Sequence, residues 1–177
     1  MMTAVDSLCL YTKDWEASAE RFRVEVGGPS EKREITNFTA LRQATRDFCN
    51  VKLLYFSTHG RGCGMQLDDG SIVEDFRMIV APSTFLWKNA RILFDGCAIG
   101  EGPKGDEFLD SAGEHLLRGH GGIVGASTVD TFCWTIGPWS SETYMEFQRG
   151  ALVKIRRYDI SGHRTGWLER DRYGRAA

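Results

Sequence analysis

The sequence of 177 residues predicts an α/β fold in which helices flank, in three layers, a mostly parallel central sheet of about six strands. Two observations carry this prediction. Three apolar runs, at 52–58, 90–96 and 121–128, lack regular polar alternation and are typical of strands that are buried on both faces. Stretches with helical spacing lie between the runs, and strands that alternate with helices favour a parallel sheet.

The first half of the chain is expected to alternate short strands and helices. The run at 21–26 alternates apolar and polar residues with a period of two and ends at Gly27, which is typical of a strand. Asn37 is a suitable N-cap for the helix that follows it. The expected elements are a strand at 6–12, a short helix within 14–22, a strand at 21–26, a charged connection at 30–35, a helix at 38–49 and a strand at 52–58.

The second half repeats the alternation after a glycine-rich segment. The stretch 105–119 predicts an amphipathic helix, because its apolar residues cluster on one face. The run at 151–160 is expected to form an edge strand. The full order is a glycine-rich loop or hairpin at 60–73, helical turns within 74–87, a strand at 90–96, a helix at 105–119, a strand at 121–128, a helix at 140–150 and the strand at 151–160.

The net charge of −2 argues against nucleic acid or a membrane as the dominant partner. This charge is unevenly distributed, because residues 151–177 contain seven Lys and Arg against three acids, which leaves about −6 for the first 150 residues. We expect one domain over 1–160 and a basic C-terminal tail over 161–177. The basic segment is interpreted either as a solvated face or as a contact surface for an acidic partner.

The cysteines indicate a reducing compartment. There are five, at positions 9, 49, 63, 97 and 133, and no two form a CxxC pair. The N-terminus has no basic segment followed by a long apolar one, and no apolar run approaches the 18 or more residues of a membrane span. We therefore expect a cytosolic chain with reduced thiols and no membrane partner.

Two residues with catalytic potential follow buried strands. His59 comes after the strand at 52–58, and Cys97 comes after the strand at 90–96. If these strands are neighbours in a parallel sheet, both side chains emerge at the same edge, where an imidazole can take the proton of a thiol. Glycines beside both residues allow a substrate backbone to approach, and the amides of Gly60 and Cys97 are candidate donors to an oxyanion.

The segments "YFSTHG" and "ILFDGCAIGEG" together resemble the caspase-like cysteine peptidases, in which one hydrophobic strand ends in His-Gly and a second ends in the nucleophilic Cys. The resemblance covers the order of elements from Asp6 to Ile160. It implies a caspase-like sandwich with His59 as general base, Cys97 as nucleophile, and the amides of Gly60 and Cys97 as the oxyanion hole. It implies no cofactor for the chemistry, although some relatives need calcium or another activating ligand.

The surroundings of Cys97 depart from the caspase pattern. The QAC signature is absent, and "DGCAIG" is more similar to the Asp-x-Cys-x-x-Gly of metacaspases. By that likeness Asp95 lines an acidic pocket for Arg or Lys, although it also fits a turn residue that caps local amides. The likeness extends to "GASTVDTF", which makes Ser127, Thr128 and Asp130 candidate substrate-binding residues, with Asp68 or Asp69 in reserve as the second acid.

Other chemistries fit the sequence less well. A cysteine phosphatase needs Arg six residues after the nucleophile, where Pro103 stands, and a nucleophile elbow needs Gly at the positions of Asp95 and Ile99. No zinc-ligand spacing and no phosphate-binding loop is present, so no metal is expected. The predicted function is cysteine endopeptidase activity on protein or peptide substrates. The alternative is a latent or inactive caspase-like domain that acts as a regulatory, protein-binding module.

Overall fold

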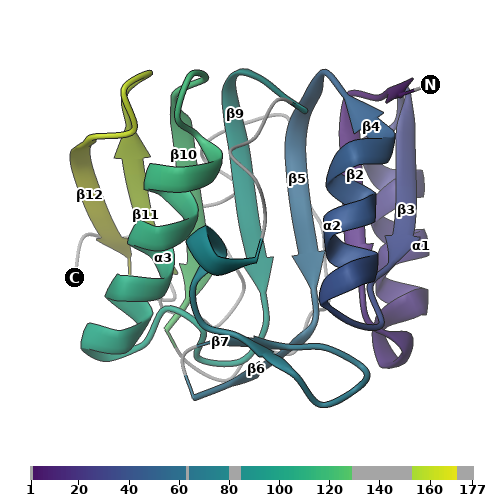
Figure 1. The fold of residues 1–177 in the computed structure, drawn as a ribbon, viewed down its shortest axis with the longest axis horizontal. Coiled ribbons are helices and arrows are strands. Elements are labelled where there is room, and N and C mark those ends of the chain that lie inside the picture. Colours follow the sequence, from purple (N-terminus) through teal and green to yellow (C-terminus); the bar gives the residue numbers. More distant parts are fainter. Residues whose placement is uncertain (1, 63, 80–84, 129–152, 171–177) are drawn as a thin grey trace.

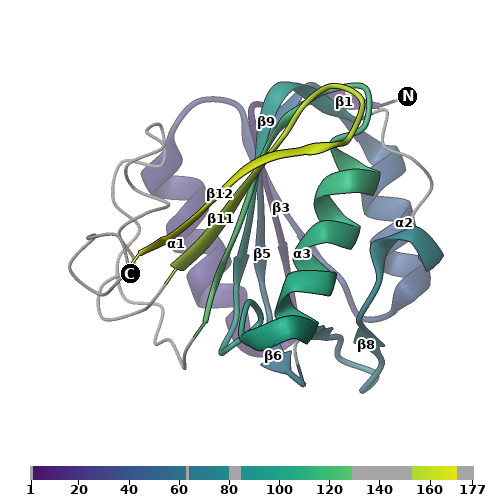
Figure 2. The same ribbon diagram turned by 90° about the vertical axis from the view of Figure 1, so that its left-hand side faces the viewer.

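The protein has an α/β architecture, seen in a computed structural model that describes residues 2–62, 64–79, 85–128 and 153–170. Figure 2 shows the central sheet between α1 on one side and α2 and α3 on the other. The main helices are α1 (Glu16–Val26), α2 (Phe38–Asp47) and α3 (Gly102–Leu116), with 3-10 turns η1 (Lys13–Trp15) and η2 (Phe76–Met78). The expected layered sandwich with a mostly parallel sheet is confirmed.

The central sheet contains seven strands in the order β12-β11-β10-β9-β5-β2-β3 (Figure 1). Neighbours from β3 to β10 are parallel, whereas β11 and β12 form an antiparallel hairpin at one edge. The bounds are β2 (Ser7–Tyr11), β3 (Ser30–Glu34), β5 (Val51–Ser57), β9 (Leu86–Asp95), β10 (Gly122–Ser127), β11 (Val153–Tyr158) and β12 (Arg164–Arg170). The strand order reverses between β2 and β5, and ligands in such sheets bind beyond the carboxyl ends of the strands at that point.

Two small sheets complete the fold. β6 (His59–Arg61), β7 (Gly64–Gln66) and β8 (Ile72–Val73) form antiparallel hairpins, as the glycine-rich segment predicted. β1 (Thr3–Ala4) pairs with β4 (Phe48–Cys49) at the amino ends of the main strands. The three-stranded sheet lies below the carboxyl ends of β5 and β9 in Figure 1. The hairpins therefore lie at the edge of the sheet where His59 and Cys97 were expected.

Two predicted elements in the first 35 residues were wrong. Residues 21–26 belong to α1 and not to a strand, because Trp15, Ala19, Phe22 and Val26 follow a helical spacing and pack on one face of the sheet. Residues 30–34, expected as a connection, form β3. This strand lies at the sheet edge, where charged side chains are tolerated, so its sequence shows no apolar pattern.

The C-terminal segment also differs from the prediction. Residues 164–170, expected within a basic tail, form β12 in the central sheet. The strand at 153–158 is therefore covered on both sides, and β12 takes the edge. The cause is tertiary pairing, because an antiparallel partner satisfies the backbone of a polar segment that shows no apolar periodicity. The helix expected at 140–150 lies outside the described residues.

The core consists of two apolar layers, one on each face of the sheet. On the face covered by α2 and α3, the ring of Phe94 lies 4.8 Å from both Phe56 and Phe108. On the face covered by α1, Phe22 stacks on Tyr55 at 4.7 Å. Each aromatic pair adds about 0.5–1.5 kcal/mol beyond area burial, so the rings hold β5 and β9 under the helices. None of the helices among the described residues is long and apolar enough to cross a membrane.

Ion pairs fasten the β11–β12 hairpin to α3. The Arg156 guanidinium, only 6% exposed, donates from Nη1 to Asp110 at 2.6 Å, and the Tyr158 hydroxyl donates to the same oxygen at 2.7 Å. Arg164 approaches the other Asp110 oxygen at 3.1 Å. Removing one partner of a buried charge pair leaves the other charge uncompensated, so Asp110 is central to the attachment of the hairpin.

We predict that this attachment weakens in acid. Burial favours the neutral form of Asp110, but hydrogen bonds from Arg156 and Tyr158 and the charges of Arg156 and Arg164 outweigh it and lower its pKa below 3.8. A carboxyl group whose pKa is lowered by folding stabilises the fold above its ordinary pKa, and this contribution is lost as the pH falls through the folded value. The free energy of unfolding, measured in urea, should therefore differ between wild type and Asp110→Asn more at pH 7 than at an acid pH low enough to protonate Asp110 in the folded protein.

The control for this comparison is Asp6→Asn. Asp6 forms an exposed pair with Lys52 at 2.8 Å, with side chains 47% and 51% exposed. Exposed pairs of this kind contribute little to stability, so wild type and Asp6→Asn should differ little at either pH. An Asp110→Asn difference of equal size at both pH values would contradict the prediction.

Candidate active site

The candidate site lies at the carboxyl ends of β5 and β9. Ser57 at the end of β5 is in register with Asp95 at the end of β9. His59 and Cys97 each follow this matched pair by two residues, and His59 opens β6 while Cys97 opens a turn. The parallel pairing that the sequence predicted therefore brings both residues to the same edge of the sheet.

The two segments beyond these strands are in direct backbone contact. A Cβ built on Gly60 would lie 2.8 Å from the carbonyl carbon of Cys97, 2.9 Å from its nitrogen, and closer still to its oxygen. A Cβ on Gly96 would lie 2.8 Å from the carbonyl oxygen of Thr58 and 3.0 Å from the nitrogen of Gly60. Only glycine fits at these two positions, and the amides of Gly60 and Cys97 consequently lie in neighbouring backbone segments.

Cys97 lies on a tight turn over residues 97–100 that leads into α3. Ala98, directly after it, has a positive φ of 53°, a conformation that costs a residue with a Cβ roughly 1–2 kcal/mol. The turn is fastened to the neighbouring strand, because the amide of Gly100 donates to the carbonyl of Ser127 at 2.7 Å. Backbone strain of this kind is concentrated at functional sites, and here it fixes the position of a half-buried thiol.

His59 has a carboxylate neighbour that the sequence analysis missed. Its Nε2 lies 3.2 Å from Oδ2 of Asp14, and the edge of its ring contacts Trp15 with centroids 5.4 Å apart. Both residues belong to η1, just after β2. The segment "KDW" directly follows the strand predicted at 6–12, so its place at the carboxyl edge was a usable signal. The position of β2 beside β5 was not predictable from that segment alone.

The loop that holds Asp14 is anchored by neighbouring segments. The amide of Lys13 donates to both carboxylate oxygens of Asp68, at 3.0 and 3.2 Å. The amide of Thr12 donates to the carbonyl of Ser57 at 3.2 Å, which extends the pairing of β2 and β5 by one residue. Asp68, a reserve candidate for substrate binding, thus supports the segment next to His59.

The carboxylate of Asp95 is buried, with the residue only 2% exposed. It accepts a hydrogen bond from the hydroxyl of Tyr55, two residues before Ser57 on the adjacent strand. Asp95 and Tyr55 lie on the α1 side of the sheet, since side chains alternate along each strand. A buried carboxyl group therefore lies two residues before Cys97, on the strand beside the one that leads to His59.

Several buried polar atoms around His59 have no hydrogen-bond partner within the described part of the chain. They are the hydroxyls of Thr12, Ser57 and Thr58 and the indole Nε1 of Trp15. All four lie at the carboxyl ends of β2 and β5, where the strand order reverses. Buried polar groups are satisfied in nearly all folded proteins, so this concentration gives the edge the character of a functional site.

The remaining predicted pocket residues lie at the end of β10 or after it. Ser127 is fully buried and Thr128 is 7% exposed, and both lie at the same edge of the sheet as Cys97. Asp130 lies outside the described residues. Among the residues that the structure describes, no three His, Cys, Asp or Glu side chains gather in a way that would hold a metal ion.

Comparisons with known proteins identify no family for this chain. No family model, no curated protein and no solved structure matches the chain. The chemistry of the site must therefore be argued from its own residues.

We predict that Gly60→Ala moves the Cys97 turn. The added methyl group would overlap the backbone of Cys97, and backbone atoms cannot move aside as a flexible side chain can. We expect a loss of about 1–3 kcal/mol in the free energy of unfolding. We also expect a changed rate of alkylation of Cys97 by iodoacetamide, followed by mass spectrometry of the peptide that contains it.

The matched control is Gly62→Asn. A Cβ added to Gly62 would meet no atom within 4 Å, and the φ of 59° at this position is one that asparagine tolerates. This variant should retain wild-type stability and the wild-type alkylation rate. If Gly60→Ala and Gly62→Asn had the same stability and the same alkylation rate, the contact between Gly60 and Cys97 would not position the thiol.

Proposed function

We propose that the protein is a cysteine endopeptidase of caspase-like fold that cleaves after basic residues. The observation that carries the proposal is the placement of His59 and Cys97 two residues beyond a matched pair on adjacent parallel strands, with their backbones joined at Gly60. An imidazole and a thiol at one sheet edge form the minimal set for acyl transfer.

Asp14 gives the imidazole a defined orientation in this proposal. A carboxylate at Nε2 favours the tautomer in which Nε2 carries the proton, which leaves Nδ1 to accept the proton of Cys97. The second ring contact, with Trp15, restricts rotation of the imidazole. Asp14 is therefore a positioning residue for the general base and does not touch the reacting atoms.

The reaction would proceed by covalent catalysis. The Cys97 thiolate attacks the scissile carbonyl carbon, and the amides of Gly60 and Cys97 donate to the oxyanion that forms. His59 then protonates the leaving amine as the C–N bond breaks, which leaves a thioester on Cys97. Water, deprotonated by His59, attacks the thioester and releases the acid product and the thiol.

The preference for Arg or Lys before the scissile bond rests on Asp95. This carboxylate lies two residues before Cys97 and one strand from Ser57, whose buried hydroxyl makes no hydrogen bond within the described residues. A cationic side chain that reaches Asp95 would gain a charge-assisted hydrogen bond in a low-dielectric setting. Ser127, Thr128 and Asp130 are proposed to line the same pocket.

The test is cleavage of a fluorogenic peptide library that varies the residue before the scissile bond. Wild type should cleave after Arg or Lys, and Cys97→Ala and His59→Ala should each lose roughly 100-fold or more in kcat/KM. Asp14→Asn should lower kcat more than it raises KM, because it disturbs orientation and not substrate binding. Asp95→Asn should abolish the preference for basic residues while retaining the reactivity of the Cys97 thiol toward iodoacetamide.

Two exposed or peripheral residues supply matched controls. His163→Ala removes an imidazole that is 82% exposed, and Cys49→Ala removes a partly buried thiol in β4, so both variants should keep wild-type turnover. Cleavage after other residues would retain the dyad and overturn the role of Asp95. The absence of cleavage with any peptide, with or without calcium, would favour a latent module that binds a regulatory protein partner.

A further inference from the structure

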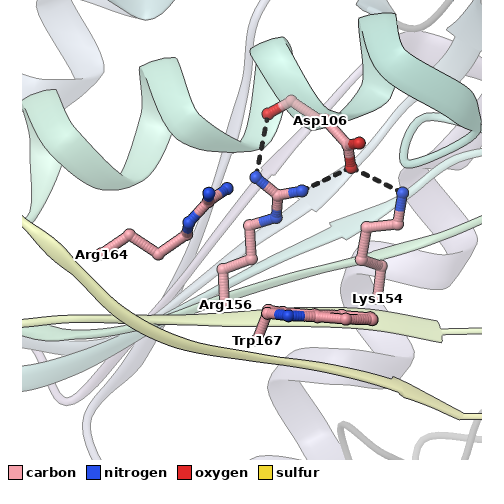
Figure 3. A pocket seen from close by; sticks show the side chains of 5 residues that line it. All are labelled: Asp106, Lys154, Arg156, Arg164 and Trp167. Carbon is pink, nitrogen blue, oxygen red and sulfur yellow. Dashed lines mark hydrogen bonds and ion pairs between the residues drawn. The ribbon is translucent and has the colours of Figure 1, made fainter.

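A second concave site lies on the opposite part of the sheet, away from His59. An open cavity of about 320 Å³ lies between α3 and the β11–β12 hairpin. Its lining residues are Asp106, Lys154, Arg156, Arg164 and Trp167 (Figure 3). Small-molecule sites begin at roughly this volume, so the cavity has room for a ligand of modest size.

An irregularity in strand pairing creates this lining. Arg156 is directly opposite Trp167, so both side chains lie on the face of the hairpin that meets α3. Arg164 and Trp167 are three residues apart and would point to opposite faces in a regular strand. The register shifts between Arg157 and Tyr158, which pairs Tyr158 with Arg164 and returns Arg164 to the cavity side.

Charged side chains from α3 and from the hairpin meet at the cavity. Lys154, Arg156 and Arg164 form ion pairs with two carboxylates of α3, Asp106 and Asp110. Oδ1 of Asp106 accepts hydrogen bonds from Lys154 at 2.6 Å and from Arg156, whereas its Oδ2 accepts no hydrogen bond from the described residues. Within these ion pairs, three cations share two carboxylates.

Two arginines beside the cavity have guanidinium donors without a hydrogen bond among the described contacts. The residue Arg156 is only 5% exposed, and its Nε has no partner within the described part of the chain. Arg164 binds Asp110 through Nη1 alone among the described contacts, which leaves the rest of its guanidinium able to bind a ligand. A buried arginine with an unsatisfied donor is uncommon, and an anionic oxygen is the group that satisfies it best.

Trp167 provides an apolar floor beside these cations. It lies on the edge strand β12 and remains 65% exposed although it lines the cavity. Figure 3 shows its ring lying below the side chains of Arg156 and Lys154, with Arg164 at one end of the cavity. An exposed indole face next to these cations suits a planar base, because bases stack on aromatic rings.

We propose that this cavity binds a nucleotide. The phosphate oxygens accept hydrogen bonds from Arg164, Arg156 and Lys154, and the base stacks on Trp167. Oδ2 of Asp106 accepts a hydrogen bond from a ribose hydroxyl. The ion pairs with α3 fasten the hairpin, but that structural role requires neither the unpartnered guanidinium donors nor the exposed indole.

The test is calorimetric titration with AMP, ADP, adenosine and inorganic phosphate, carried out on wild type and on Cys97→Ala. AMP and ADP should bind more tightly than about 1 mM, ADP the more tightly, and adenosine and phosphate should each bind at least tenfold more weakly than AMP. Because binding is measured directly, the result does not depend on peptidase activity. If wild type and Cys97→Ala bind the nucleotides with equal affinity, this site is independent of the one proposed at His59.

Variants of exposed residues test the two halves of the cavity. Arg164→Gln and Trp167→Ala should each weaken ADP binding about tenfold, and Arg164→Gln should lower the melting temperature only slightly, because the Arg164 side chain in its ion pair with Asp110 is 45% exposed. The control Arg157→Gln removes the same charge from the adjacent position of β11, on the opposite face, and should leave binding unchanged. A second control, Trp87→Ala, removes an indole that is 48% exposed on β9.

Three results would overturn the proposal. The first is the absence of AMP and ADP binding to wild type at millimolar concentration. The second is binding of an oligoglutamate peptide but not of nucleotides, which would assign the basic surface to an acidic protein partner. The third is an equal loss of ADP binding in Arg157→Gln and Arg164→Gln, because that loss would reflect net charge and not the cavity.

Discussion

The close backbone contact between Gly60 and Cys97 is the constraint on which the candidate active site depends. Parallel pairing of β5 with β9 brings the ends of the two strands within one strand spacing, but side chains at the crossing point would hold the following segments apart. Glycine at positions 60 and 96 removes that obstacle from both directions. The aromatic side chains on both faces of the sheet then hold the two strands in place, so the strand ends that carry the site are fixed by the core.

The edge of the sheet around His59 contains features that lower local stability. Ala98 has a left-handed backbone conformation, and the hydroxyls of Thr12, Ser57 and Thr58 are buried without hydrogen-bond partners in the described part of the chain. Backbone strain and unpartnered buried hydroxyls therefore occur together at this edge, beside well-packed apolar layers. Such a division is expected where a rigid scaffold carries a reactive site.

Helix α3 connects the two proposed sites. It begins just after the Cys97 turn, and Gly105 in its first turns packs against the backbone of Gly100. Asp106, the next residue, and Asp110, one turn further along, hold the β11–β12 hairpin, and Asp106 lines the charged cavity. The same helix thus fixes the end of the Cys97 turn and the position of the β11–β12 hairpin. Both proposed sites therefore depend on the packing of α3.

The sequence by itself determined the buried strands, a helix that overlaps most of 105–119, and the position of His59 and Cys97 just beyond two of those strands, because long apolar runs and glycines are local signals. It did not determine that 21–26 is helical or that 30–34 and 164–170 are strands, since charged edge strands are stabilised by their neighbours and show no apolar period. Asp14 and the cavity with Trp167 were decided only by the tertiary structure. The first needs β2 beside β5, and the second needs a shift in register within the β11–β12 hairpin and the packing of that hairpin on α3. Neither arrangement can be read from a single segment of the sequence.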